Sequence, residues 1–183
     1  INVDTLLISL YEAYEPVCLK GKKERNVVFH IVGDGDAVPE LKAMVQTSEK
    51  LKNNVIFYGF RAGAELEEIY KLGDIGISAL GFHRLGVYNA SPLKSKEYFA
   101  KGLPVVGTTV EHDVIRSKAS KYFLAFPEDD SDISIDKICY FYNSLQEEKC
   151  TNTQIAGTAA KEFDWRSIMR PIYEKLSEEG ISE

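Results

Sequence analysis

Residues that could carry chemistry gather between Asn89 and Thr109 of this 183-residue chain. Ser91 and Pro92 form a helix-start signal, because a serine hydroxyl accepts a bond from an unpaired N–H and proline fits the first helical position. Gly102 stands where a left-handed cap is expected at the helix end. We predict a helix of about three turns between them, followed by a short buried strand.

The start of this helix suits an anion. The N–H groups of Leu93 and Lys94 have no partner within the helix and carry the positive end of its dipole, and Lys94 and Lys96 add full charges. A diphosphate is the natural occupant. Glu97 lies one turn further along the same face, and its carboxylate suits the two hydroxyl groups of a ribose. The alternative is that Lys94 and Glu97 form an ordinary exposed ion pair.

From Asn89 the chain runs through seven residues to Glu97 and then reads Tyr-Phe-Ala-Lys-Gly-Leu-Pro-Val-Val-Gly-Thr. This pattern resembles the signature of the retaining glycosyltransferase family 4, which is acid, seven residues, acid, then Ala-x-Ala-x-Gly-x-Pro-Val-Val-x-Thr. The resemblance implies that Glu97 holds the ribose and that Leu93 and Lys94, with Ser91 beside them, hold the diphosphate. Asn89 replaces the first acid, which contacts the donor sugar in that family, and an amide also binds a sugar hydroxyl.

Two further loops follow predicted strands. The strand at 27–32 ends in Gly33-Asp34-Gly35-Asp36, and the resemblance implies that Gly33 and Gly35 let the backbone approach the donor. An NAD fingerprint is incomplete here, because the third glycine is replaced by valine. A metal or receiver-type pocket is an alternative for the two acids, although Asp is also favoured in turns.

The strand at 55–59 leads into the second loop, with Phe60 and Arg61, which the resemblance places beside the nucleotide base. For Arg61 the alternative is a solvated loop cation. A third loop, 81–88, carries His83 and Arg84 as its cations. Loops at the carboxyl ends of parallel strands bind ligands in open α/β sheets, so both residues could line the pocket, or His83 could be an exposed loop histidine.

Apolar runs alternate with amphipathic segments along the chain. This alternation predicts an α/β fold, a doubly wound, Rossmann-like parallel sheet. The five strands are expected at 27–32, 55–59, 74–80, 103–107 and 122–126. Helices are expected at 3–19, 38–51, 65–72, 91–101, 133–145, 154–163 and 164–176, with Trp165 as a packing anchor of the last, and a short helix or turn at 111–118.

The resemblance implies that residues 1–183 are a single nucleotide-sugar-binding domain, the C-terminal half of a two-domain GT-B enzyme, and that this half lacks its first strand. The catalytic residues would then lie in an absent N-terminal domain, normally in cis, and the fragment alone would be inactive. A missing interior strand leaves unpaired sheet edges, so self-association is expected.

The net charge, the cysteine spacing and the length of the apolar runs disfavour several classes of function. The net charge of −6, without blocks of like charge, disfavours a nucleic-acid surface. Cys18, Cys139 and Cys150 are odd in number and lack CxxC spacing, so we expect reduced thiols and no zinc site. No apolar run is long enough to span a membrane. We expect a cytoplasmic protein, and the resemblance adds a peripheral place at the inner membrane face.

The implied function is donor binding in a retaining, metal-independent glycosyltransferase. Such an enzyme moves a hexose-type sugar from a UDP-sugar or GDP-sugar to a glycan or lipid-linked acceptor, as in polysaccharide biosynthesis, and needs no cofactor. Two alternatives remain on the residues alone. One is a non-catalytic Rossmann-like module that binds a nucleotide or NAD, and the other is a purely structural domain.

Overall fold

The structure of the chain is a computed structural model in which residues 27–178 are described. Its strands are β1 (Phe29–Val32), β2 (Val55–Gly59), β3 (Gly76–Ile77), β4 (Val105–Thr108) and β5 (Phe123–Phe126). Its α-helices are α2 (Val38–Thr47), α3 (Glu49–Lys52), α4 (Gly63–Tyr70), α5 (Leu93–Ala100), α6 (His112–Ile115), α7 (Ile135–Glu147), α8 (Asn152–Phe163) and α9 (Trp165–Glu178). Two 3-10 helices, η1 (Phe82–Leu85) and η2 (Lys118–Tyr122), complete the elements of this region. The helix predicted at 3–19, with Cys18, lies outside it.

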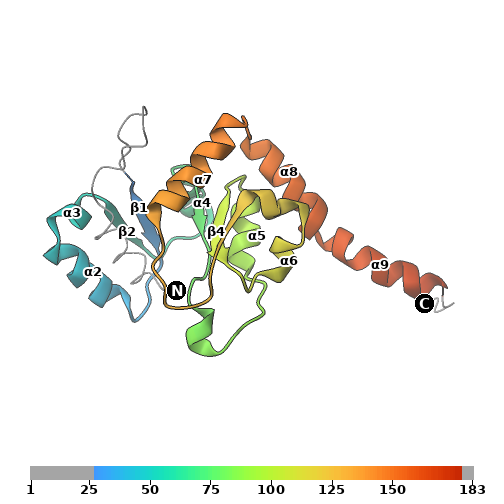
Figure 1. The fold of residues 1–183 in the computed structure, drawn as a ribbon, viewed down its shortest axis with the longest axis horizontal. Coiled ribbons are helices and arrows are strands. Elements are labelled where there is room, and N and C mark those ends of the chain that lie inside the picture. The colour runs from blue at the N-terminus through green and yellow to red at the C-terminus, as the bar shows by residue number, and fades with distance from the viewer. Residues whose placement is uncertain (1–26, 179–183) are drawn as a thin grey trace. The chain divides into compact units, whose positions relative to one another are not determined.

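The described residues divide into two compact units. Unit 1 contains residues 27–74 and 129–143, and unit 2 contains residues 75–128 and 144–178. The boundary therefore crosses α7. Each unit contains parallel strands followed by helices, which is the α/β arrangement that the alternating sequence pattern predicts (Figure 1).

Unit 1 is built on a two-stranded parallel sheet in which β1 pairs with β2, Phe29 opposite Val55. Its buried apolar side chains include Leu41 and Val45 of α2, Leu51 of α3 and Val55 at the start of β2. The predicted single helix at 38–51 is divided, because Ser48 is extended and its hydroxyl accepts the Leu51 N–H to begin α3.

Unit 2 contains a three-stranded parallel sheet in the order β3-β4-β5. The central strand β4 is buried along its whole length, as its apolar run predicts. The ring of Tyr98 on α5 lies directly on Gly76 of β3, where an added Cβ would be 2.2 Å from the ring. Phe99 stacks on Phe163 of α8 with centroids 6.0 Å apart. These contacts seat α5 between the sheet and α8.

All strand pairs are parallel, as predicted, but they form two sheets rather than one continuous sheet. Among the described residues, β1 pairs only with β2 and β3 only with β4. Hydrophobic runs predict where strands occur, but lateral partners depend on contacts between distant segments. The self-association expected from unpaired strand edges stays a prediction.

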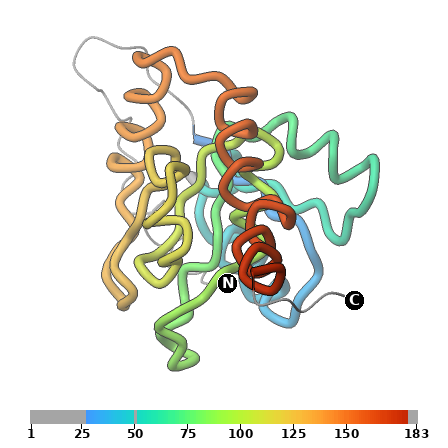
Figure 2. Tube along the Cα trace, turned by 90° about the vertical axis from the view of Figure 1, so that its right-hand side faces the viewer, coloured from blue at the N-terminus to red at the C-terminus, as the bar shows by residue number. Residues whose placement is uncertain are grey.

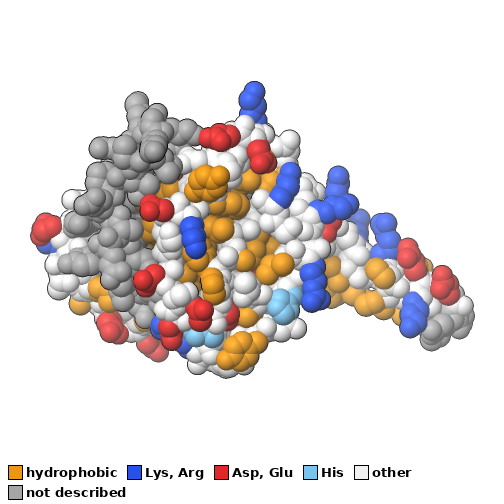
Figure 3. Space-filling view, viewed as in Figure 1, with side chains coloured by type: hydrophobic (Ala, Val, Ile, Leu, Met, Phe, Trp, Pro, Cys, Tyr) orange, Lys and Arg blue, Asp and Glu red, His pale blue; other side chains and the backbone are white. Residues whose placement is uncertain are grey.

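The last helix differs from its prediction. Trp165 was expected to be a packing anchor, yet its side chain is 71% exposed. The structure shows no buried residue in α9, which continues beyond α8 (Figure 1) and carries apolar, basic and acidic side chains on the face seen in Figure 3. The amphipathic pattern correctly predicted a helix, but it could not show that unit 2 leaves this indole uncovered.

Candidate functional site

The first turn of α5 is open at its N-terminus. The helix begins at Leu93 with Pro92 as N-cap in an extended conformation, ψ 134°, and no side chain caps the first N–H groups. The prediction that Ser91 caps the helix and Pro92 opens it is therefore wrong, and the helix has two turns rather than three. The N–H groups at 93 and 94 still have no side-chain cap, and anion binding at this helix end stays a prediction.

Ser91 has a different partner because a carboxylate lies within its reach. Its hydroxyl donates to Asp113 Oδ2 at 2.7 Å, and Lys96 Nζ lies 2.6 Å from the same oxygen. The Lys96 ammonium also lies 5.3 Å from the centre of the Phe163 ring. Lys96 was expected to add positive charge for a phosphate, but the structure commits it to Asp113 and to the Phe163 ring.

The stability that the Lys96–Asp113 pair contributes should depend on pH. The direction of this dependence follows from the sign of the pKa shift of Asp113. Burial by itself raises the pKa of Asp113, but hydrogen bonds from Lys96 and Ser91 outweigh it and lower the pKa. The stabilisation is therefore present above the ordinary Asp pKa of about 3.9 and is lost as the pH falls through the folded value. Asp113→Asn should cost at most about 1 kcal/mol at neutral pH, because the Asp113 side chain is 37% exposed and water screens the pair. Urea unfolding should show this difference shrinking in acid, and a difference that grew in acid would contradict the assignment.

Glu97 lies one turn beyond the start of α5. Its carboxylate is exposed and accepts no hydrogen bond from any residue that the structure describes. Desolvation lowers the pKa of Lys94, and the negative charge of Glu97 opposes part of this shift. The two side chains therefore interact electrostatically without a direct ion pair in the described region. Glu97 keeps its lone pairs available for hydroxyl groups.

The segment that leads into α5 places Asn89 at the surface. The adjacent Ala90 donates its N–H to the Val110 carbonyl at 3.1 Å, which ties this segment to the chain after β4. Exposed apolar side chains flank it at Leu85, Tyr88 and Leu93. Figure 2 shows the 78–92 segment extending from the sheet before it returns to α5.

A buried polar cluster lies beneath the start of α5. Ser78, Ser95 and Glu111 have no exposed surface. Ser95 Oγ donates to Glu111 Oε2 at 2.5 Å, and the two serine hydroxyls are 2.7 Å apart. Burial raises the pKa of Glu111, and the serine hydrogen bonds only partly offset this. Sequence patterns missed this carboxyl, although Val110 and Val114 on either side of it are apolar.

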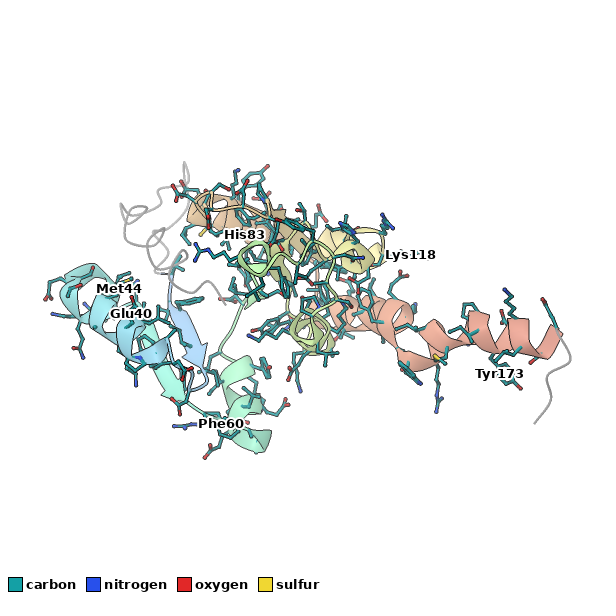
Figure 4. The ribbon with its side chains drawn as sticks, turned by 90° about the horizontal axis from the view of Figure 1, so that it is seen from below. Glu40, Met44, Phe60, His83, Lys118 and Tyr173 are labelled. Atoms are coloured by element: carbon teal, nitrogen blue, oxygen red, sulfur yellow. The ribbon has the colours of Figure 1, made fainter. Side chains whose placement is uncertain are left out.

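The loop between β3 and α5 is anchored at η1. The backbone N–H of His83 donates to Glu128 Oε1 at 2.7 Å, and His83 Nδ1 lies 3.2 Å from the same oxygen. Because a carboxylate only accepts, the ring donates through Nδ1–H. The side chains of His83 and Glu128 are 11% and 6% exposed, which excludes the exposed-loop interpretation of His83. Figure 4 shows where His83 lies among the side chains of this loop.

Removing this anchor should destabilise the loop. Glu128→Ala removes the acceptor of two part-buried hydrogen bonds from His83, and we expect a loss of about 1–3 kcal/mol in the free energy of unfolding. Glu128→Gln retains an amide oxygen and serves as the matched control, with a clearly smaller loss. Urea unfolding of both variants measures the difference. Equal losses would mean that an amide oxygen does not replace the carboxylate as acceptor, and would contradict the prediction for Glu128→Gln.

The remaining predicted residues lie in unit 1, on the loops after β1 and β2. Gly33 donates its N–H to the Gly59 carbonyl at 2.9 Å, and Asp34 Oδ2 accepts the Phe60 N–H at 3.1 Å. The two loops are thus brought together by Asp34, for which the sequence offered a turn role or a metal or receiver-type pocket but not this link. Gly35 is exposed in the same turn.

The side chains of the second loop face solvent. Phe60 is 71% exposed, and Figure 4 shows it at the edge of unit 1. Arg61 donates to the Phe60 carbonyl at 2.7 Å and lies 3.6 Å from Glu65. An exposed ring beside a guanidinium is suited to stacking on a planar group such as a base.

Together these features define a Rossmann-like α/β protein with an open helix N-terminus after a parallel strand and a nearby carboxylate. That class binds phosphorylated ligands at the carboxyl ends of its strands. The model of the family described as "Glycosyl transferases group 1" matches residues 6–144. Because this match covers most of the chain, the protein belongs to the group 1 glycosyl transferases, which assigns glycosyl transfer as its general activity.

A search of curated proteins gave no match. Across residues 27–178, no helix combines the length and apolar character needed to cross a bilayer. Within the described residues, Cys139 and Cys150 are not joined in a disulfide.

Proposed function

We propose that this chain supplies the donor site of a retaining glycosyltransferase of family 4, as the C-terminal domain of a GT-B enzyme. The observation that carries the proposal is the start of α5, where uncapped N–H groups lie one turn from the uncommitted Glu97 carboxylate. Membership in the group 1 glycosyl transferases supports a nucleotide-sugar ligand at such a site.

In this proposal the N–H groups of Leu93 and Lys94 hold the diphosphate and Glu97 holds the ribose hydroxyls. As the glycosidic bond to the sugar breaks, negative charge develops on the departing diphosphate. Fixed N–H dipoles and the Lys94 ammonium stabilise that charge without reorganising. The catalytic site would be completed by residues outside this chain, so the chain alone would transfer sugar poorly or not at all.

The other proposed donor contacts follow from position. Asn89 would hydrogen-bond a hydroxyl of the transferred hexose, and Ser91 would support the phosphate end through its bond to Asp113. For Gly33, Gly35, Phe60 and Arg61, which lie in unit 1, contact with the donor stays a prediction from the resemblance. The proposed donor is a UDP-sugar or GDP-sugar and the acceptor a glycan or lipid-linked sugar. No metal or other cofactor is part of the proposal.

Thermal unfolding of the chain with UDP, GDP and NAD tests this function. A ligand at a hundredfold excess over its Kd stabilises the folded state by about 2.7 kcal/mol, so a binding nucleotide should raise Tm visibly. We expect UDP or GDP to raise Tm and NAD to leave it unchanged. Stabilisation by NAD alone would favour a dinucleotide-binding module. No stabilisation by any of them would favour a structural domain.

A further inference from the structure

The buried carboxyl of Glu111 has no evident purpose in an ordinary core. A carboxyl group buried away from water is costly unless it is hydrogen-bonded. The nearest basic group of the cluster, Lys96, already lies against Asp113. The partners of Glu111 are instead neutral hydroxyls, with Ser95 Oγ at 2.5 Å from its Oε2. This arrangement calls for an explanation beyond charge pairing.

The position of Glu111 links three elements of unit 2. The residue is the N-cap of α6, just after β4, and its side chain reaches Ser95 in the first turn of α5. Ser95 in turn touches Ser78, which follows β3. A Cβ added to Gly107 would lie 2.6 Å from Glu111 Oε1, so the carboxyl rests against the backbone of β4. The side chain therefore has little freedom to move.

We propose that Glu111 is a positioning residue of the donor site, which holds the first turn of α5 through Ser95 so that its N–H groups face the diphosphate. This inference rests on the function proposed above. Ser95 is the third residue of α5, directly after the two residues whose N–H groups are open. A hydrogen bond at that point controls the direction of the helix start at short range.

Because Glu111 is buried, its contribution to stability and to nucleotide affinity should depend on pH. Desolvation raises the pKa of Glu111 and the charge of Asp113 adds to the rise, while Ser95, Ser78 and Lys96 oppose it. While it is protonated, the Glu111 carboxyl adds no negative charge near a site that binds a diphosphate. The folded state therefore retains the proton that the unfolded chain releases, and stability and nucleotide affinity should both fall as the pH rises through the folded pKa.

The test compares Glu111→Gln with Glu111→Ala in the full chain. Calorimetric titration with UDP and GDP gives Kd across a pH series, and hydrogen exchange of the α5 amides reports the helix start. We expect Glu111→Ala to weaken binding about tenfold and to speed exchange in the first turn of α5, because Ser95 loses its carboxyl acceptor and keeps only Ser78. Glu111→Gln should keep the affinity within about twofold and lose its pH dependence, because an amide does not ionise.

The outcomes distinguish a failure of the positioning role of Glu111 from a failure of the proposed donor site. If the unaltered chain binds UDP or GDP and Glu111→Ala binds equally well with unchanged exchange, the positioning role is wrong and the donor site stands. If Glu111→Gln keeps the pH dependence of the unaltered chain, another group causes it and the proposal is again overturned. If the unaltered chain binds neither nucleotide, the donor site itself fails and the positioning role falls with it.

Discussion

Replacing Glu97 with alanine should weaken binding of the preferred nucleoside diphosphate by about 1–3 kcal/mol, or about 5- to 150-fold in Kd. The expected loss is large because the carboxylate accepts no hydrogen bond from the residues that the structure describes. The ribose hydroxyls therefore replace only water when the nucleotide binds. Calorimetric titration with UDP and GDP measures it. The folded stability should change little, because Glu97 is exposed and supports no contact that the structure describes.

Two variants make this experiment specific. Glu97→Gln keeps one acceptor oxygen and loses the charge, so its affinity should fall between those of the unaltered chain and Glu97→Ala. Glu174→Ala removes the same charge from the exposed surface of α9 and should leave Kd unchanged. If Glu97→Ala and Glu174→Ala bind the nucleotide equally well, the ribose role of Glu97 is refuted.

Replacing Gly102 with alanine should destabilise unit 2 by about 2–5 kcal/mol. Gly102 has φ +78°, and an added Cβ would lie 2.5 Å from the carbonyl oxygen of Asn152, the first residue of α8. Alanine therefore meets both the left-handed penalty and a backbone collision, and backbone atoms cannot move aside as a flexible side chain can. Urea unfolding gives the change in free energy.

Gly86 provides a matched control for this substitution. It also lies in the left-handed region, at φ +67°, but an added Cβ meets no atom within 4 Å. Gly86→Ala should therefore cost only the conformational penalty, about 1–2 kcal/mol. The difference between the two variants isolates the collision with α8. Equal losses would show that α8 gives way, and that the contact does not hold the end of α5.

Local sequence patterns predicted much of the fold. The bounds of β2 match its apolar run, and Gly102 caps α5 in the left-handed conformation that its position suggested. A further signal was present in Thr151 and Gln154, which form a complete capping box at the start of α8. These features depend on residues close together in the chain, so a short window of sequence contains their cause.

Part of the candidate site could be predicted in the same way. The spacing of Leu93, Lys94 and Glu97 on one helix defines their relative positions, and α5 indeed presents them in its first turns. The prediction that Ser91 caps the helix was wrong, because local sequence does not show distant partners. Its cap motif was locally sound, but Asp113, 22 residues away, takes its hydroxyl. A charged acceptor competes more strongly for that hydroxyl than a backbone group does.

The sequence by itself determined the parallel α/β class, the helix that opens near Pro92 and the family to which the chain belongs. Only the tertiary structure decided that Glu111 is buried, that His83 is held by Glu128, and that the strands pair in two sheets. The physical reason is range. Propensity, capping and periodicity act over a few neighbouring residues, whereas burial, carboxylate partners and strand pairing depend on segments that meet only when the chain folds.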